Sequence, residues 1–288
     1  MKKFIISILL LIGVGSGAFF LGKNKGAEKA KSLLEQEIPM EQAIREVEVS
    51  IWETSNALFY YMVRPSKTSL EEYKHQLAEV NEFMSKYKKL IETDEERAVA
   101  KKFDNSWKQV MSKAEALFQA RDEFQKTQEK AWDMIHEADD IVDYKLQPAL
   151  LPGSPDLLKK EKAVREVEVS IWEAINATNY YAYRQFDKPK REYSTQIQDV
   201  KEFIGVYKNL QLTSTEKLHL VEFEARWQKA VDFMNKLYKD ADNLTEALSV
   251  FWEVVHKNDD IIDFEIQAHL AKRISKWNAS KQFGITQK

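Results

Sequence analysis

The sequence contains an internal repeat: residues 45–150 recur as residues 165–270 at a constant offset of 120, without insertion or deletion. Trp52, Trp107 and Trp132 correspond to Trp172, Trp227 and Trp252, and the strings REVEVSIWE and DDI recur letter for letter. A repeat of this length means that one structural unit occurs twice, so it constrains the fold more than any single motif does.

Composition then limits the fold classes and the functions that this chain could have. The 288 residues include 44% hydrophobic and 31% charged residues but only 8 Gly and 6 Pro, which predicts an all-α fold. The 43 basic and 46 acidic residues are interspersed and give a net charge of -3, so nucleic-acid binding is not expected. The absence of cysteine excludes disulfides, thiolate metal sites and a cysteine nucleophile.

The N-terminus predicts a membrane segment. Lys2 and Lys3 precede an apolar run from Phe4 to Leu21, so residues 1–26 are expected to form a single-pass signal anchor. A cleavable signal peptide is the alternative, because Ser16-Gly17-Ala18 offers small residues for cleavage. On this interpretation the rest of the chain is extracytoplasmic at the inner membrane of a bacterium, and Gly13 with Gly17 could pair two anchors in a homodimer.

The three-four spacing of apolar residues predicts three helices in each repeat. Ser69 with Glu72, Thr93 with Glu96 and Thr213 with Glu216 have the spacing of capping boxes. The third helix has no Gly or Pro and is expected to be a rod of about 57 residues, roughly 85 Å long. Such a rod is about twice as long as the second helix, so one repeat alone would leave half of its apolar seam uncovered.

The expected solution is two stacked four-helix bundles, each built from both repeats (residues 27–151 and 152–272) and followed by a polar tail at 273–288. Ser154 is expected to cap the next helix, with Pro155 in its first turn. With the two rods antiparallel, residue numbers at one level would sum to about 363. This register places Trp107 near His256 and Trp52 beside Trp107, and it predicts the ion pairs Arg45 with Asp260 and Arg165 with Asp140.

This layout resembles the helical bimodular sensor domains of bacterial chemoreceptors and sensor histidine kinases. The likeness covers residues 27–272, where WExxNxxxYY and WxxxHxxDDIxD are the recurring elements. The resemblance implies a sensory module that binds a small molecule, often an organic acid, or a partner protein. This chain has neither a second apolar run nor an output domain, so a separate membrane signalling protein would have to read any signal.

Residues near the ends of the first helices form the predicted ligand site. Arg64 and Arg184 could bind a carboxylate in a bidentate manner, and neighbouring hydroxyl, amide and indole groups could complete the site. Compensation of the helix dipole by arginine, together with ordinary aromatic packing, is the structural alternative. The remaining members of the predicted site are Asn56, Asn176, Tyr60, Tyr61, Tyr180, Tyr181, Trp52 and Trp172.

A metal site is a remote possibility, because Glu253 and His256 form one E-x-x-H pair whereas a di-iron bundle needs two. No cofactor and no enzymatic activity are expected. The leading hypothesis is therefore a membrane-anchored extracytoplasmic module for a small anionic solute or a partner protein. A structural scaffold without a small ligand is the alternative, and a metal-dependent bundle oxidase is the remote one.

Overall fold

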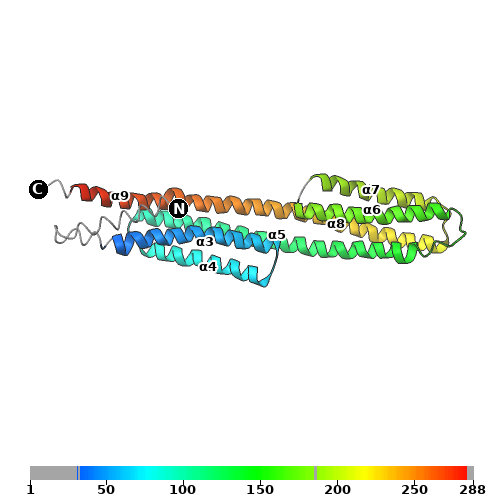
Figure 1. Ribbon diagram of the computed structural model, residues 1–288, viewed down its shortest axis with the longest axis horizontal. Helices are drawn as coiled ribbons and strands as arrows, with labels where there is room; N and C mark the ends of the chain where they lie inside the picture. Colours follow the sequence, from blue (N-terminus) through cyan, green and yellow to red (C-terminus); the bar gives the residue numbers. More distant parts are fainter. Residues whose placement is uncertain (1–30, 32, 185–186, 284–288) are drawn as a thin grey trace. The chain divides into compact units, whose positions relative to one another are not determined.

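The computed structural model describes residue 31 and residues 33–184 and 187–283, and these residues are almost entirely helical, with no strand among them (Figure 1). The all-α prediction is therefore confirmed. The α-helices are α3 (Ile38–Val63), α4 (Lys67–Lys89), α5 (Asp94–Ile141), α6 (Leu157–Arg184), α7 (Asp187–Lys208), α8 (Ser214–Ile261) and α9 (Gln267–Phe283). Three π-helical turns adjoin them: η1 (Leu33–Glu37), η2 (Val142–Leu146) and η3 (Ile262–Ile266).

The third helix of each repeat is long, as expected. Helix α5 has 48 residues and passes directly into η2, and α8 has 48 residues and continues through η3 into α9. Helix α9 reaches Phe283, so helical structure extends into the segment predicted as a polar tail. The predicted membrane anchor at residues 1–26 lies outside the described residues. Within the described part of the chain, no helix is both long and apolar enough to span a bilayer.

The chain divides into two compact units that do not coincide with the two repeats. Unit 1 contains the chain up to Ala114 and again from Phe251, and unit 2 contains Glu115–Val250. Helices α5 and α8 therefore each contribute one part to each unit. A unit assembled from both repeats follows physically from the length of these helices, because each apolar seam extends beyond the helices of its own repeat.

In unit 1, α3 packs against α4, and parts of α5 and α8 complete the core. The Asn258 amide of α8 donates a hydrogen bond to the Phe103 carbonyl of α5 at 3.4 Å. Large side chains that are fully or almost fully buried in this unit are Met40, Ile44, Ile51, Leu58, Tyr87, Phe103 and Phe251.

In unit 2, α6 packs against α7, and the first part of α8 and the second part of α5 contribute to the same apolar cluster. The Arg226 guanidinium of α8 lies 2.7 Å from the Glu137 carboxylate of α5, which fits the register expected for antiparallel rods. Buried members of this core include Leu146, Val167, Ile171, Val200, Tyr207, Phe223 and Met234.

The two units carry the same cross-repeat ion pair with reversed polarity. In unit 1, Lys102 of α5 pairs with Glu265 of η3. At the equivalent positions of unit 2, Glu222 of α8 pairs with Lys145 of η2 at 2.5 Å. Pairing these positions within one repeat would bring together two lysines or two glutamates, so the charges favour association between repeats.

Two of the three predicted capping boxes are present. Thr93 with Glu96 and Thr213 with Glu216 form the predicted capping boxes. The box predicted at Ser69 and Glu72 is wrong: Ser66 is the N-cap of α4 and exchanges hydrogen bonds with Ser69. Helix α3 ends at Val63, and Ser66, which directly follows Pro65, is extended and caps α4.

The turn between the repeats also differs from the expectation. Gly153 and Asp156 both have positive φ, at 80° and 59°, so the chain makes a tight turn before α6 begins at Leu157. Pro155 therefore precedes the first turn of α6. The predicted Ser154 cap is wrong, because the Ser154 hydroxyl has no hydrogen-bond partner within the described residues. The backbone N–H groups of Lys159 and Lys160 both donate to the Asp156 carbonyl at 2.9 Å.

Candidate functional site: the tryptophan–carboxylate clusters

A cluster of aromatic and acidic side chains lies between α3 and the end of α8 in unit 1. The Trp52 ring stacks on Trp252 at 6.3 Å between centroids and meets His256 edge-on at 5.6 Å. Positions 252, 256 and 259 of α8 and position 263 of η3 follow at steps of three and four residues and so share one flank. Trp107, which the sequence predicts beside Trp52, stacks on Phe103 of its own helix.

The carboxylates of this cluster are close enough to perturb one another. Burial, and next the charges of Asp263 and Asp259, raise the pKa of Glu48, while Arg45 lowers it. Burial also raises the pKa of Asp259, which accepts a hydrogen bond from the Trp52 indole. A positive charge nearby would reduce the repulsion between these carboxylates, so the cluster favours a cation over an anion.

Unit 2 repeats the arrangement between α5 and α6. Trp132 stacks on His136 at 5.6 Å, and His136 meets Trp172 edge-on at 6.1 Å. Asp139, which corresponds to Asp259, is 7% exposed. Burial, and next the charges of Asp143 and Glu168, raise its pKa to about 6.

One amide connects the two helices in each cluster. The Gln147 side chain donates to Asp143 at 3.1 Å and to Glu168 at 3.0 Å, and Gln267 donates in the same way to Asp263 at 3.1 Å and to Glu48 at 3.3 Å. Both glutamines directly follow a π-helical turn, in which the extra residue turns the chain beyond it about the helix axis. The turns η2 and η3 thus help to direct these amides toward the neighbouring helix.

An open groove extends the unit 2 cluster along α6. Its volume is about 430 Å³, within the range of small-molecule sites. Glu168 and Gln147 belong both to this groove and to the cluster, and Arg165 lies one helical turn before Glu168. The groove is lined by Gln147, Leu150, Glu161, Val164, Arg165 and Glu168.

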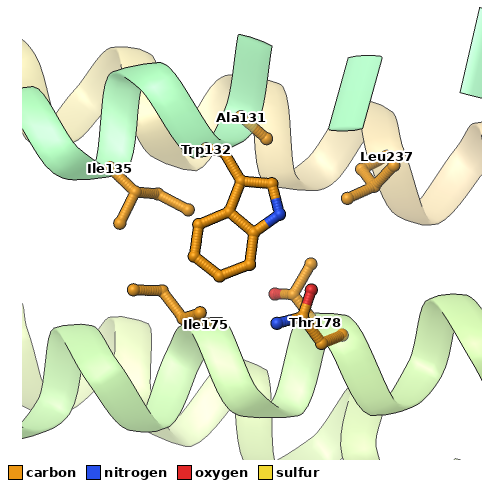
Figure 2. A pocket seen from close by; sticks show the side chains of 7 residues that line it. Ala131, Trp132, Ile135, Ile175, Thr178 and Leu237 are labelled. Carbon is orange, nitrogen blue, oxygen red and sulfur yellow. The ribbon is translucent and has the colours of Figure 1, made fainter. Parts of the chain in front are cut away.

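A second cavity lies beneath Trp132 and is much smaller. Figure 2 shows Trp132 projecting from α5 toward Ile175 and Thr178 of α6, with Leu237 of α8 nearby. The space measures about 10 Å³, which accommodates one water molecule at most. This cavity therefore does not accommodate an organic ligand.

The residues predicted as a ligand site at the end of α3 do not line either of the two cavities described above. Arg64 is an exposed C-cap whose backbone N–H donates to the Tyr60 carbonyl at 2.8 Å. Tyr60 is 69% exposed, Asn56 is exposed, and Tyr61 is half-buried. The structural role foreseen for the arginine, at a helix C-terminus, matches this geometry.

In unit 2, Arg184 is the last residue of α6, and its side chain lies outside the described part. Tyr180 is 61% exposed and Asn176 is exposed. Tyr181 is buried, donates to Asp242 and packs 4.5 Å from the Tyr238 ring. Of the predicted binding residues, Trp52 and Trp172 are the two that belong to the clusters.

The predicted ion pairs Arg45 with Asp260 and Arg165 with Asp140 are not among those of the described residues. The nearest observed equivalent is the effect of Arg45 on the pKa of Glu48. Glu253 pairs with Lys257 at 2.5 Å, while His256 contacts the tryptophans. Within the described ranges, no group of three or more His, Asp or Glu side chains has the geometry to hold a metal ion.

Two buried charge sites were missed at the sequence level. Lys160 is fully buried and bonds both carboxylate oxygens of Glu216, at 2.9 and 3.1 Å. In unit 1, Arg273 contacts Glu96, Glu37 and Glu92 at 3.1 to 3.3 Å. The only available signal was the pair of capping-box glutamates, each of which needs a cation if it is buried.

Comparison with known proteins adds no assignment. No protein-family model and no curated protein matches this chain.

Proposed function

We propose that this chain is a non-enzymatic, membrane-anchored extracytoplasmic binding module of the bimodular sensory type. In this proposal each unit is a four-helix bundle, the two bundles stack, and a membrane signalling partner reads the signal. The observation that supports it is the recurrence of the tryptophan–carboxylate cluster. In both units a helix of one repeat and a helix of the other contribute a half-exposed tryptophan, a histidine and several carboxylates.

A ligand bound at a tryptophan–carboxylate cluster would contact two helices at once. Packed helices shift against each other by about 1–2 Å when an interface switches, so binding at the clusters would change the position of α3 relative to α8, or of α6 relative to α5. The Gln147 and Gln267 amides, which already connect these helices, would transmit the change.

A thermal-melt panel tests the proposal. The full chain is melted with dicarboxylates, amino acids and amines, and a ligand of any of these classes should raise Tm by mass action. The shift should disappear in a Trp52→Leu/Trp172→Leu double variant. It should persist in Tyr144→Leu/Phe264→Leu, which removes exposed rings at equivalent positions of the two repeats. The proposal fails if no compound shifts Tm, or if both double variants respond alike.

A structural scaffold is the second candidate, favoured by exposed apolar side chains near the turn between the repeats. Leu158 is 80% exposed, Tyr144 75% and Leu151 58%, and exposed apolar groups close together often mark a contact surface. If these residues mediate self-association, Leu158→Lys should lower the sedimentation coefficient of the full chain at a given concentration. An unchanged sedimentation coefficient would remove this support.

A further inference from the structure

The unit 2 cluster has more carboxylates than basic groups. Besides burial, the charges of Asp143, Glu168 and Asp140 raise the pKa of Asp139, while His136 lowers it. The Gln147 amide bridges two of them but is neutral. Arg165 lines the same groove, yet forms no ion pair with these carboxylates in the described part of the chain.

A second and independent feature is an unpartnered buried oxygen. Asp139 is 7% exposed, and its Oδ1 atom has no hydrogen-bond partner within the described residues. The Oδ1 atom of the equivalent Asp259 also has no partner within the described residues, although Trp52 donates a hydrogen bond to the Asp259 carboxylate. A buried carboxylate oxygen without a partner is costly, and a bound donor or positive charge nearby would reduce that cost.

The aromatic rings supply the third feature. Trp172 is 40% exposed and lies edge-on to His136, which stacks on Trp132. A tryptophan ring attracts a cation placed over its face, most strongly when the cation is weakly hydrated. Tryptophan faces beside carboxylates are the chemistry that recognises an alkylammonium group.

We propose that the groove between α6 and the segment after η2 in unit 2 binds a small organic cation. Its ammonium group would lie at the Glu168 end of the groove, between the Trp172 ring and the carboxylates of Asp139, Asp143 and Glu168. This inference rests on the proposed binding function and replaces the anionic ligand expected from the sequence. The groove toward Leu150 and Val164 would take the rest of the ligand, and Arg165 would select against a second positive charge there.

The test uses the full chain and tetramethylammonium chloride, with Tm and tryptophan fluorescence as readouts. Sodium chloride at equal concentration controls for ionic strength, tert-butanol supplies the same shape without charge, and succinate supplies the opposite charge. Tetramethylammonium should give saturable changes that the other three compounds do not give. Its apparent Kd should rise roughly tenfold in Glu168→Gln and in Trp172→Leu.

Matched controls identify the site. Glu173→Gln removes an exposed carboxylate from the same helix, and Tyr144→Leu removes an exposed ring from η2; neither should change the Kd more than twofold. Equal responses in control and site variants would overturn the proposal. A saturable response to succinate but not to tetramethylammonium would overturn the cation while leaving the binding function intact. If no compound, including those of the wider panel above, changes Tm or tryptophan fluorescence, both the cation site and the proposed binding function are wrong.

Discussion

Units 1 and 2 bury the same glutamate and neutralise it from different parts of the chain. In unit 2, Glu216 is held by Lys160 of α6, and both side chains are almost completely inaccessible. In unit 1 the position equivalent to Lys160 is Met40, and Arg273 of α9 bonds Glu96 instead. The capping box fixes the glutamate in both places, because its carboxylate accepts from the loop backbone. The counter-ion is free to change position as long as one is present.

The largest expected effect comes from making unit 2 resemble unit 1. Lys160→Met leaves Glu216 buried without its cation, and breaking a buried pair in this way costs about 3–5 kcal/mol. Urea unfolding of the full chain should show this loss. Lys159→Met, at an exposed neighbour, is the control. Adding Glu216→Gln to Lys160→Met should recover part of the loss, and a Lys160→Met loss no larger than that of the control would contradict the interpretation.

The corresponding change in unit 1 should be smaller. Arg273 is 14% exposed and one of its partners, Glu92, is 55% exposed, so water can compensate part of the lost charge. Arg273→Met is expected to cost about 2–3 kcal/mol. Hydrogen exchange should accelerate first in α9 and η1, which Arg273 connects through Glu37. Exchange that accelerates equally in unit 2 would argue against a local role, and Lys272→Met is the control.

Asp139 and Asp259 offer a comparison by pH. The pKa of Asp139 is raised from 3.8 to about 6, so its contribution to stability is greatest below 3.8 and declines as pH rises through about 6. Asp139→Asn should therefore increase the free energy of unfolding by roughly 1–2 kcal/mol near pH 7.5 and change it little near pH 4. Urea unfolding across this range checks the sign.

Asp259→Asn should show the same sign with a smaller amplitude, because Asp259 is less buried and has the Trp52 hydrogen bond. Exposed Asp133→Asn, on the same helix, is the control. A loss of stability in Asp139→Asn near neutral pH would mean that its carboxylate has a stabilising partner. If the proposed cation site is correct, the same variant should also weaken tetramethylammonium binding.

The reversed ion pairs should have the smallest effect. Lys102→Glu places two glutamates together in unit 1, and for so exposed a pair the loss should not exceed about 1 kcal/mol. Glu265→Lys in the same chain should restore it by copying the polarity of unit 2. A double-mutant cycle measures the coupling, with Lys101→Glu as the control. Zero coupling would show that these charges do not favour association between repeats.

The parts of the fold that could be predicted are those determined by periodicity and spacing. The unbroken seam of the third helix predicted a long rod, and Thr93 and Thr213 predicted their capping boxes because that geometry is local. Helix register could place His136 and Trp172 at the same level of their helices. The partners of Arg45 and Arg165 could not, because a residue at the right level can still point to another side of the helix.

The cation that neutralises Glu96 could not be predicted either. Arg273 is 177 residues away in sequence, and its equivalent in the other repeat is Gly153, so the repeat itself offered no guide. The π-helical turns were missed because a single extra residue in a long helix alters apolar spacing no more than a polar substitution does.

The π-helical turns η2 and η3, which occupy equivalent positions in the two repeats, also bear on the history of the chain. A π turn is less favourable than the α-helix that would replace it after deletion of one residue, so either copy could have shed its turn by one such deletion. Such a deletion would rotate the residues after the turn by about 100° about the helix axis. It would move Gln147 or Gln267 away from its glutamate. Both copies keep the turn at the same offset, which suggests that the rotational phase of the helix beyond the turn, rather than local helix stability, has been maintained since the duplication.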